Sequence, residues 1–331
     1  MATINDVCKV TGLSKATVSR VINGSEQVKP ATRKLVTAAM KQLNYHPSSV
    51  AQALATKVSN TIGLILPEFQ SNYFGNILYQ AEQCVQKANK KLVVVNSKKH
   101  SEGEQDAVRA LAFQRCDAIL LYSRHLTSDE LVALQAEVNI PLIALNRQLT
   151  SDKIISLGLE QTQLARIAME HLLELGHRNI ACITSPLNSE TGRRRHQVYQ
   201  DLLAPYHSDI PESWTAEGDN TIQTGYDSTV KLLHASTPFT AIFACNDDMA
   251  LGALRALHDA QLKVPDDVAV IGIDNEPAAG YSIPSLSTVA LPISELTDAA
   301  MQLAIKYSNK TEVPITHQTY LGKLIVRESS C

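Results

Sequence analysis

A short run near the N-terminus combines cationic, hydroxyl and small side chains at helical spacing. Lysine and arginine can donate hydrogen bonds to O6 and N7 of guanine, and an alanine methyl group suits the methyl of thymine. Such a face suits a DNA major groove better than a protein core. If the residues after Ser14 form a helix with its valines inward, the outward face consists of Lys15, Ala16, Ser19 and Arg20.

Two short helices must position this face, and residues 3–23 predict them. Thr3 is a favourable cap for the first helix, as Ser14 is for the second. Gly12 between them can adopt positive φ without steric cost, which allows a tight turn. A helix-turn-helix of this kind lays its second helix in the major groove. The inward stripe expected on the first helix consists of Ile4, Val7 and Val10.

A third helix is expected to begin at Lys29-Pro30, because proline at the first helical position loses no hydrogen bond. It ends before Pro47, since the residue before a proline avoids helical angles. The three helices predict an all-α DNA-binding headpiece over residues 1–46. The buried stripe expected on the third helix consists of Leu35, Val36, Ala39, Met40 and Leu43.

The charges are divided unevenly along the chain. Residues 1–60 hold eight Lys or Arg and two acidic residues, whereas the other 271 residues hold 22 basic and 31 acidic ones. The N-terminal part is therefore strongly basic and the remainder is acidic. This distribution is typical of a DNA-binding module attached to a body that does not itself bind DNA.

The composition argues against several other classes of protein. The N-terminus lacks a charged lead followed by an apolar run, so we expect no signal peptide and a cytoplasmic location. No apolar stretch approaches the length of a membrane span. The six cysteines are scattered singly, as in a reducing cytosol, without the spacing of a metal site. We expect neither a bound metal nor a cofactor.

From Thr61 onward, apolar runs alternate with amphipathic stretches, which implies β-α-β units and parallel strands. This pattern is compatible with one broad sheet or with two doubly wound sheets and a cleft between them. The expected strands are 62–66, 92–95, 118–122, 142–145, 154–157, 180–183, 241–245, 268–273 and 287–291. The expected helices are 74–89, 104–115, 128–137, 161–175, 192–204, 224–235, 248–261 and 293–307.

Nucleotide-dependent enzymes share this alternation, so an enzymatic function must be considered. The sequence has no G-x-G-x-x-G after the first strand, no G-x-x-x-x-G-K-[ST] and no G-x-S-x-G. The histidines and the acidic pair Asp247-Asp248 show no metal-ligand spacing. The sequence therefore favours a binding protein, and we expect no catalysis.

Five separated runs resemble the LacI/GalR family of transcriptional regulators, the lac/galactose repressors. They are residues 3–23, V-A-Q-A-L-A at 50–55, E-L-G-H-R-N-I-A at 174–181, A-C-N-D-D-M-A-L-G-A-L at 244–254 and V-A-V-I-G-I-D-N at 268–275. The resemblance implies an α/β fold with the all-α headpiece, a hinge helix and linker over 47–60, and a periplasmic-binding-protein-like core over 61–331.

The resemblance also selects two doubly wound parallel-sheet subdomains over a single sheet. The chain is expected to cross between them near residues 159, 289 and 321. The N-subdomain then comprises about 61–159 and 289–320, and the C-subdomain about 160–288 and 321–331.

The same resemblance implies roles in DNA recognition. Lys15 and Ala16 match the pair that sets operator choice, and Arg20 matches a residue that reaches a guanine. Leu54 matches a leucine that wedges into the minor groove, where apolar side chains unstack and kink the duplex. Contacts to phosphates, which position a protein without specifying sequence, are expected from Thr17, Asn23, Gln27 and Thr32.

An effector site is implied at the carboxyl ends of the strands, where open α/β sheets bind ligands. Sugar hydroxyls need donors and acceptors arranged around them. Relatives often place aromatic residues where this chain has Ser156 and Asn220, and Asp where it has Gly158. A stacking platform is then either missing or supplied by Phe69, Tyr73, Phe74 or Tyr122. The expected effector-binding residues are Phe69, Tyr73, Tyr122, Arg124, Asn146, Arg147, Arg193, Asn220, Asn246 and Asp274.

The resemblance thus implies a repressor that binds double-stranded, pseudo-palindromic operator DNA under control of a small-molecule effector, a sugar or sugar derivative. No leucine heptad follows residues 321–329, so we expect a homodimer rather than a coiled-coil tetramer. Three alternatives stay open: an effector that is a purine or another metabolite, activation in place of repression, and a ligand-binding protein without regulated DNA binding.

Overall fold

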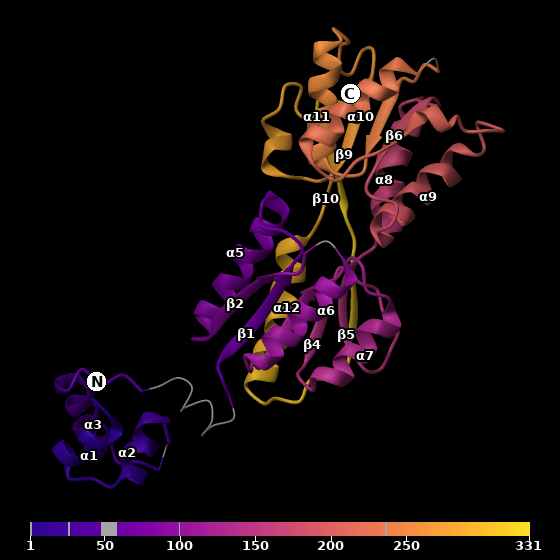
Figure 1. The fold of residues 1–331 in the computed structure, drawn as a ribbon. Coiled ribbons are helices and arrows are strands. Elements are labelled where there is room, and N and C mark those ends of the chain that lie inside the picture. Colours follow the sequence, from indigo (N-terminus) through magenta and orange to yellow (C-terminus); the bar gives the residue numbers. More distant parts are fainter. Residues whose placement is uncertain (1, 26, 48–57, 99, 236) are drawn as a thin grey trace.

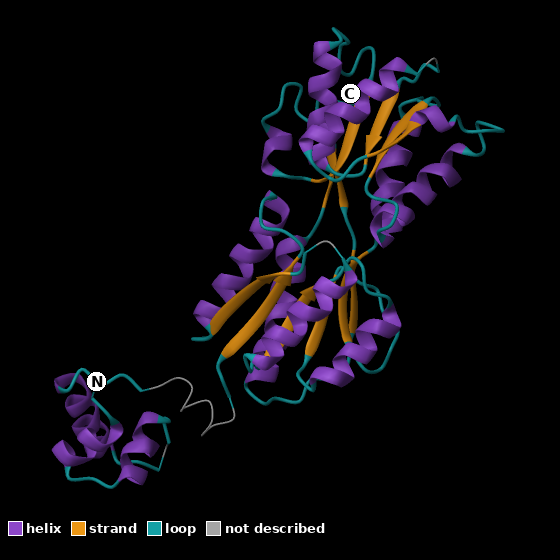
Figure 2. Cartoon of the chain, viewed as in Figure 1, coloured by secondary structure: helices purple, strands orange, loops and turns teal. Residues whose placement is uncertain are grey.

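The computed structural model describes residues 2–25, 27–47, 58–98, 100–235 and 237–331. A helical headpiece is followed by two six-stranded sheets with helices packed on them (Figures 1 and 2). This arrangement confirms the expected α/β fold with two doubly wound subdomains. The expected hinge helix and Leu54 fall in residues 48–57, which lie outside the described residues.

The headpiece contains α1 (Ile4–Thr11), α2 (Lys15–Ile22) and α3 (Pro30–Gln42), as the sequence predicts. Gly12 ends α1 with φ +67°, and the Ser14 hydroxyl accepts a hydrogen bond from the Thr17 N–H at the start of α2. The helices enclose a small core of Val7, Val18, Val21, Val36 and Ala39.

Two residues of the expected headpiece stripes are not buried. Val10 is 49% exposed and Leu35 is 48% exposed. The inward side of α1 runs instead through Val7 with Ile4 and Cys8 beside it, and the inward side of α3 runs through Val36 and Ala39. Three short helices have too little contact area to cover a wider stripe.

The first sheet of the core is wholly parallel, in the order β11-β5-β4-β3-β1-β2. Helices α5 and α12 cover one face and pack on each other, whereas α6 and α7 cover the other. Its strands are β1 (Thr61–Leu66), β2 (Lys91–Asn96), β3 (Ala118–Tyr122), β4 (Leu142–Leu145), β5 (Ile155–Leu159) and β11 (His317–Tyr320). Its helices are α5 (Asn72–Lys87), α6 (Ser101–Phe113), α7 (Ser128–Val138) and α12 (Ile293–Ser308).

The second sheet has the order β12-β10-β9-β8-β6-β7, in which only β12 is antiparallel to its neighbour among the described strands. Helices α8 and α9 pack together, as do α10 and α11. Its strands are β6 (Ile180–Thr184), β7 (Thr215–Glu217), β8 (Ala241–Ala244), β9 (Ala269–Asp274), β10 (Ser287–Ala290) and β12 (Lys323–Ile325). Its helices are α8 (Gln161–Glu174), α9 (Glu190–Leu203), α10 (Ile222–His234) and α11 (Asp247–Asp259).

The nine expected strands are all present in the described chain, but three edge strands were not expected. These are β7, β11 and β12, which are short and largely exposed or half-buried. Their sequences lack the apolar run that identifies a strand buried on both faces. Several helices also begin two or three residues earlier than expected, because the side chains of Ser71, His100, Ser189 and Thr221 cap their first turns.

The chain passes between the two sheets after β5, after β10 and between β11 and β12 (Figure 1). Strand β10 stays in the second sheet to Ala290, one residue past the boundary expected at 289. The complete subdomain boundaries stay a prediction. Within the described part of the chain, every helix is too short or too polar to cross a bilayer.

Candidate functional site

A cavity of about 210 Å³ lies where the carboxyl ends of both sets of parallel strands meet. This convergence follows from topology, because loops after neighbouring parallel strands emerge at one edge of a sheet. Eight of the ten expected effector residues line the cavity: Tyr73, Tyr122, Arg124, Asn146, Arg147, Asn220, Asn246 and Asp274. The other two expected residues, Phe69 and Arg193, do not line the cavity.

An aromatic cluster forms the wall on the first subdomain. The rings of Tyr73, Phe74 and Tyr122 pack edge to face, with centroids 5.0 to 6.0 Å apart. The Tyr122 hydroxyl donates to the Tyr73 hydroxyl at 3.2 Å, and burial raises the pKa of Tyr73 well above its usual value. Phe69 lies in the loop before α5 and is 49% exposed, so it is the one of the four expected aromatic residues that does not line the cavity.

The loop after β3 is held by a residue that the sequence analysis missed. Glu104 of α6 is fully buried and accepts hydrogen bonds from the Ser123 hydroxyl at 2.8 Å, the Arg124 N–H at 2.8 Å and the His125 N–H at 3.1 Å. Arg124 is thereby directed over the Phe74 ring at 5.1 Å, and it pairs with Glu68 at 3.7 Å. The sequence feature that could have identified Glu104 is its position as an acidic residue on the apolar side of an amphipathic helix.

The arginine of α9 that reaches the cavity is Arg195, not Arg193. Arg195 Nε donates to Gln161 Oε1 at 2.9 Å, and its Nη1 donates to the Cys245 carbonyl. Arg193 is exposed and donates to the carbonyls of the preceding loop at Leu187 and Asn188. Two residues along a helix rotate a side chain by about 200°, so only one of the pair can face inward.

The position of Arg195 was also recoverable from helical spacing. The buried side of α9 runs through Gly192, Arg195, Val198 and Tyr199, at intervals of three and four residues. Gln161 was not expected at the site. It donates to Asn146 Oδ1 at 3.1 Å, so it joins Asn146 to Arg195 across the two subdomains.

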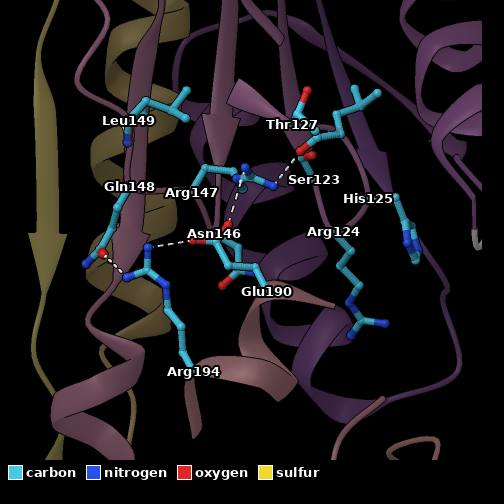
Figure 3. A network of polar contacts seen from close by, with 12 residues as sticks. Ser123, Arg124, His125, Thr127, Asn146, Arg147, Gln148, Leu149, Glu190 and Arg194 are labelled. Atoms are coloured by element: carbon cyan, nitrogen blue, oxygen red, sulfur yellow. Dashed lines mark hydrogen bonds and ion pairs between the residues drawn. The ribbon is translucent and has the colours of Figure 1, made fainter. Parts of the chain in front are cut away.

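A second polar network also crosses between the subdomains (Figure 3). Arg147, after β4, pairs with Glu190 of α9 at 3.3 Å and donates to the Leu126 carbonyl at 2.6 Å. Arg194 pairs with Glu190 at 2.7 Å and donates to Gln148 Oε1 at 2.8 Å. Arg147 thus lines the cavity while its charge is already engaged in joining the two halves.

The second subdomain contributes loops with unusual backbone angles. Asp274 ends β9 with φ +129°, Asn275 follows with φ +56°, and Asn220 has φ +70°. Asn246 caps α11 through the Met249 N–H at 3.0 Å and donates to the Asn220 carbonyl at 3.1 Å. Both polar groups of the Asn246 side chain are therefore used within the protein, which makes it a positioning residue for the Asn220 loop.

The positions that depart from the family pattern have separate explanations. A side chain at Gly158 has no room, because a Cβ atom there would lie 2.6 Å from the Arg147 carbonyl oxygen. Ser156 does not line the cavity. Its hydroxyl accepts from the Leu149 N–H at 3.2 Å and lies 2.8 Å from Nδ1 of His317. Only the departure at Asn220 changes the wall of the cavity.

The expected DNA-binding residues of the headpiece lie on or near its surface. Lys15, Ala16 and Arg20 of α2 are exposed, as are Asn23 and Gln27 in the segment after it. The remaining three, Thr17, Ser19 and Thr32, are half-buried. Three of the four residues predicted to face outward from the second helix, Lys15, Ala16 and Arg20, are therefore exposed, and Ser19 is half-buried.

Comparison with known proteins gives two family models that match separate parts of the chain and relatives that match almost all of it. Residues 3–48 match the family model described as bacterial regulatory proteins, lacI family, and residues 169–330 match the periplasmic binding protein-like domain. The HTH-type transcriptional regulator AscG of Escherichia coli strain K12 is 33% identical over 331 residues, covering 99% of this chain and 98% of AscG.

Two solved structures are similar to this chain over almost its full length. The lac repressor dimer bound to operator and the anti-inducer ONPF has a TM-score of 0.87 at 30% identity, covering 99% of this chain and 98% of that one. The complex of the transcriptional regulator CelR with cellobiose has a TM-score of 0.72 at 28% identity, covering 99% and 100%.

Proposed function

Because the chain belongs to the lacI family of bacterial regulatory proteins, we propose that a sugar or sugar derivative bound between its two sheets sets its affinity for operator DNA. It is a DNA-binding transcriptional repressor with an effector-binding core. The finer proposal is a cytoplasmic homodimer that represses transcription and whose effector contacts both subdomains at once.

The observation that carries the proposal is the chemistry of the cavity. An aromatic wall of Tyr73, Phe74 and Tyr122 faces amide, guanidinium and carboxylate groups from the second subdomain. A sugar ring presents apolar C–H faces and a rim of hydroxyl groups, which need both kinds of surface. The CelR complex with cellobiose, a similar structure, supports the same class of ligand.

DNA recognition is proposed for the exposed side of α2. Lys15 and Arg20 are placed to donate to guanine, and Ala16 to contact a thymine methyl. Phosphate contacts are proposed for Thr17, Asn23, Gln27 and Thr32, with Ser19 on the same helix face. Leu54, outside the described residues, is proposed as the minor-groove wedge. Two headpieces then occupy the half-sites of a pseudo-palindrome.

A dimer is supported by apolar side chains exposed on the second subdomain. Ile222 at the start of α10 is 51% exposed, and Tyr281 and Ile283 are 88% and 96% exposed. Aromatic side chains are enriched in protein interfaces, and the interface core is more apolar than the rest of the surface, which makes these three residues a candidate dimer surface. The lac repressor, the similar structure named above, is a dimer on its operator.

An effector acts on DNA binding only through a difference in its affinity for two states of the protein. Among the described residues, the contacts that join the subdomains include the Arg147–Glu190–Arg194 network and the chain from Asn146 through Gln161 to Arg195. A ligand that replaces or strengthens these contacts changes the angle between the subdomains, which the chain then transmits toward the headpieces.

The test is a titration of a fluorescent fragment of the gene's own promoter with the full chain, alone and with a panel of sugars and nucleobases. We expect one sugar to change the apparent Kd by about ten-fold or more, within the usual range of allosteric coupling. A response to nucleobases alone would replace the sugar in this proposal with a purine-type effector. No response to any ligand, or no DNA binding, would overturn it.

A further inference from the structure

The cavity carries an excess of negative charge among the residues that the structure describes. Three guanidinium groups, from Arg124, Arg147 and Arg195, line it. Six carboxylates line it as well: Glu68, Glu190, Asp219, Asp248, Asp274 and Glu276. Carboxylates accept hydrogen bonds from the hydroxyls of a neutral sugar, but a net excess of negative charge also favours a ligand that carries a positive charge.

Three of the carboxylates already have partners. Glu68 pairs with Arg124 at 3.7 Å, and Glu190 pairs with Arg147 at 3.3 Å and Arg194 at 2.7 Å. Asp219 accepts hydrogen bonds from the hydroxyls of its own turn, at Thr221 and Thr224. The remaining carboxylates are Asp248, Asp274 and Glu276 of the second subdomain, and near them Arg195 supplies one opposing charge, beside Asp274.

The loop after β9 holds these groups in place. Asp247 is fully buried; it accepts from the Thr288 hydroxyl at 2.6 Å and from the Glu276 N–H at 2.8 Å. Asn275 donates its N–H to the Thr288 hydroxyl at 3.2 Å and accepts from Arg327 Nη2 at 2.7 Å. The turn is thus fixed on both sides, and Glu276 is directed to the cavity at the end of β9.

Glu276 is buried without a partner for its charge. Its side chain is 7% exposed, and its Oε2 atom accepts no hydrogen bond from any described residue. A buried carboxylate oxygen left unpaired is costly. It is therefore expected to meet a donor that a ligand brings into the cavity.

The three carboxylates also act on one another. Burial, followed by the charges of Asp248 and Asp247, raises the pKa of Glu276 to about 7. Burial also raises the pKa of Asp248, and raises that of Asp274 well above its usual value although Arg195 opposes the change. This mutual repulsion is the arrangement that a bound cation relieves.

We infer that the effector is an amino sugar whose protonated amine binds among Asp248, Asp274 and Glu276. This inference rests on the proposed function and narrows its ligand class. An ammonium group offers hydrogen-bond donors, and the orphaned Glu276 Oε2 atom offers an acceptor without a protein partner, with Asp248 and Asp274 supplying negative charge in the same cavity. The sugar ring then extends toward the aromatic wall and the amide groups of Asn220 and Gln161. Among the described residues, no group of three His, Cys, Asp or Glu side chains is arranged to hold a metal ion.

The test compares matched pairs of ligands by calorimetry on the full-length protein at pH 7. The pairs are glucosamine with glucose and galactosamine with galactose, and the N-acetyl derivatives retain the nitrogen without its charge. At least one amine should bind about ten-fold or more tightly than both of its neutral partners, as expected for a desolvated charge-assisted contact. Magnesium chloride alone is the control for an inorganic cation.

The outcomes separate this inference from the proposed function. Equal or tighter binding of the neutral sugars overturns the amine inference and leaves the sugar-responsive repressor intact. Binding of magnesium without any amine preference also overturns it, in favour of a metal site. If no sugar of the panel binds, the proposed function and this inference both fail.

Variants test the named carboxylates. Glu276→Gln preserves the shape of the side chain and removes its charge, so the amine-to-neutral affinity ratio should fall to within about three-fold of unity. Asp248→Asn should reduce the same ratio and serves if Glu276→Gln does not fold. Glu312→Gln, at an exposed position outside the cavity, is the matched control. An unchanged ratio in both folded cavity variants would overturn the assignment.

Discussion

Replacing Glu276 by glutamine should stabilise the ligand-free protein at alkaline pH and have little effect at acid pH. The pKa of this carboxyl is about 7 in the folded protein, against an ordinary value of 4.5. Below pH 4.5 both folded and unfolded chains hold the proton, so the residue contributes no pH-dependent cost. Between the two pKa values the folded state holds more protons, and stability falls as the pH rises.

The magnitude follows from the size of this shift. Each pKa unit corresponds to about 1.4 kcal/mol, so the shift from 4.5 to about 7 means that ionising Glu276 above pH 7 costs the folded state roughly 3 kcal/mol. Glutamine avoids this cost and gives up no hydrogen bond at Oε2, because that atom has no partner among the described residues. For a domain of this size, Tm should rise by roughly 4–8 °C at pH 8.

The assay is thermal unfolding of dialysed, ligand-free protein at intervals from pH 5 to pH 8.5. Wild type, Glu276→Gln and the exposed control Glu312→Gln are compared at each pH. The difference between Glu276→Gln and wild type should grow steadily with pH, whereas the control should show none. A variant that is equally or less stable than wild type at pH 8 would refute the assigned burial of this carboxylate.

Three further outcomes are expected. Lys15→Ala and Arg20→Ala should each weaken operator binding by about 1–3 kcal/mol and relax base preference at one or two positions; binding-site selection showing unchanged preference would contradict this. Glu104→Ala should leave the Ser123–His125 loop without its acceptor, lowering stability by about 3 kcal/mol or more, and unaltered urea unfolding would disagree. Ile283→Asp, which places a charge on an apolar side chain 96% exposed, should yield monomers in sedimentation velocity; an intact dimer would exclude that surface.

The strands of both sheets were predictable because burial on two faces demands continuous apolar runs. Ile62–Leu66 and Ala269–Ile273 are such runs, and their order with the intervening helices predicts parallel pairing. The edge strand β11, with the sequence HQTY, has no such requirement, because its residues are largely exposed. It pairs with β5, which is distant in the sequence, and no local sequence pattern predicts this pairing.

The sequence predicted which loops form the cavity, but it did not predict all of the side chains that line it. Strand ends located Tyr122, Asn146 and Asp274, since topology brings those ends together. Which of Arg193 and Arg195 faces the cavity depends on the rotation of α9 about its axis. The family pattern predicted Arg193, which faces solvent, whereas Arg195 lines the cavity.

The sequence analysis also missed residues that hold the lining of the cavity in place, and the reason is different. Glu104 and Gln161 contribute hydrogen bonds to neighbours, and their roles exist only once the loops around them are placed. Asp247 and Glu276 are similar, because adjacent sequence does not show that the two residues meet across β8 and β9. An acidic residue on a buried helix face is the one local sign of such a role.

The most direct test of the central claim measures the full-length protein on its promoter fragment at near-physiological salt, by fluorescence anisotropy, with and without the amino and neutral sugars. The account predicts salt-dependent, sequence-specific binding that one sugar shifts by about ten-fold or more, and that Lys15→Ala and Arg20→Ala each weaken with a relaxed base preference. Binding that no ligand alters, or that competitor DNA of random sequence abolishes equally well, would contradict it.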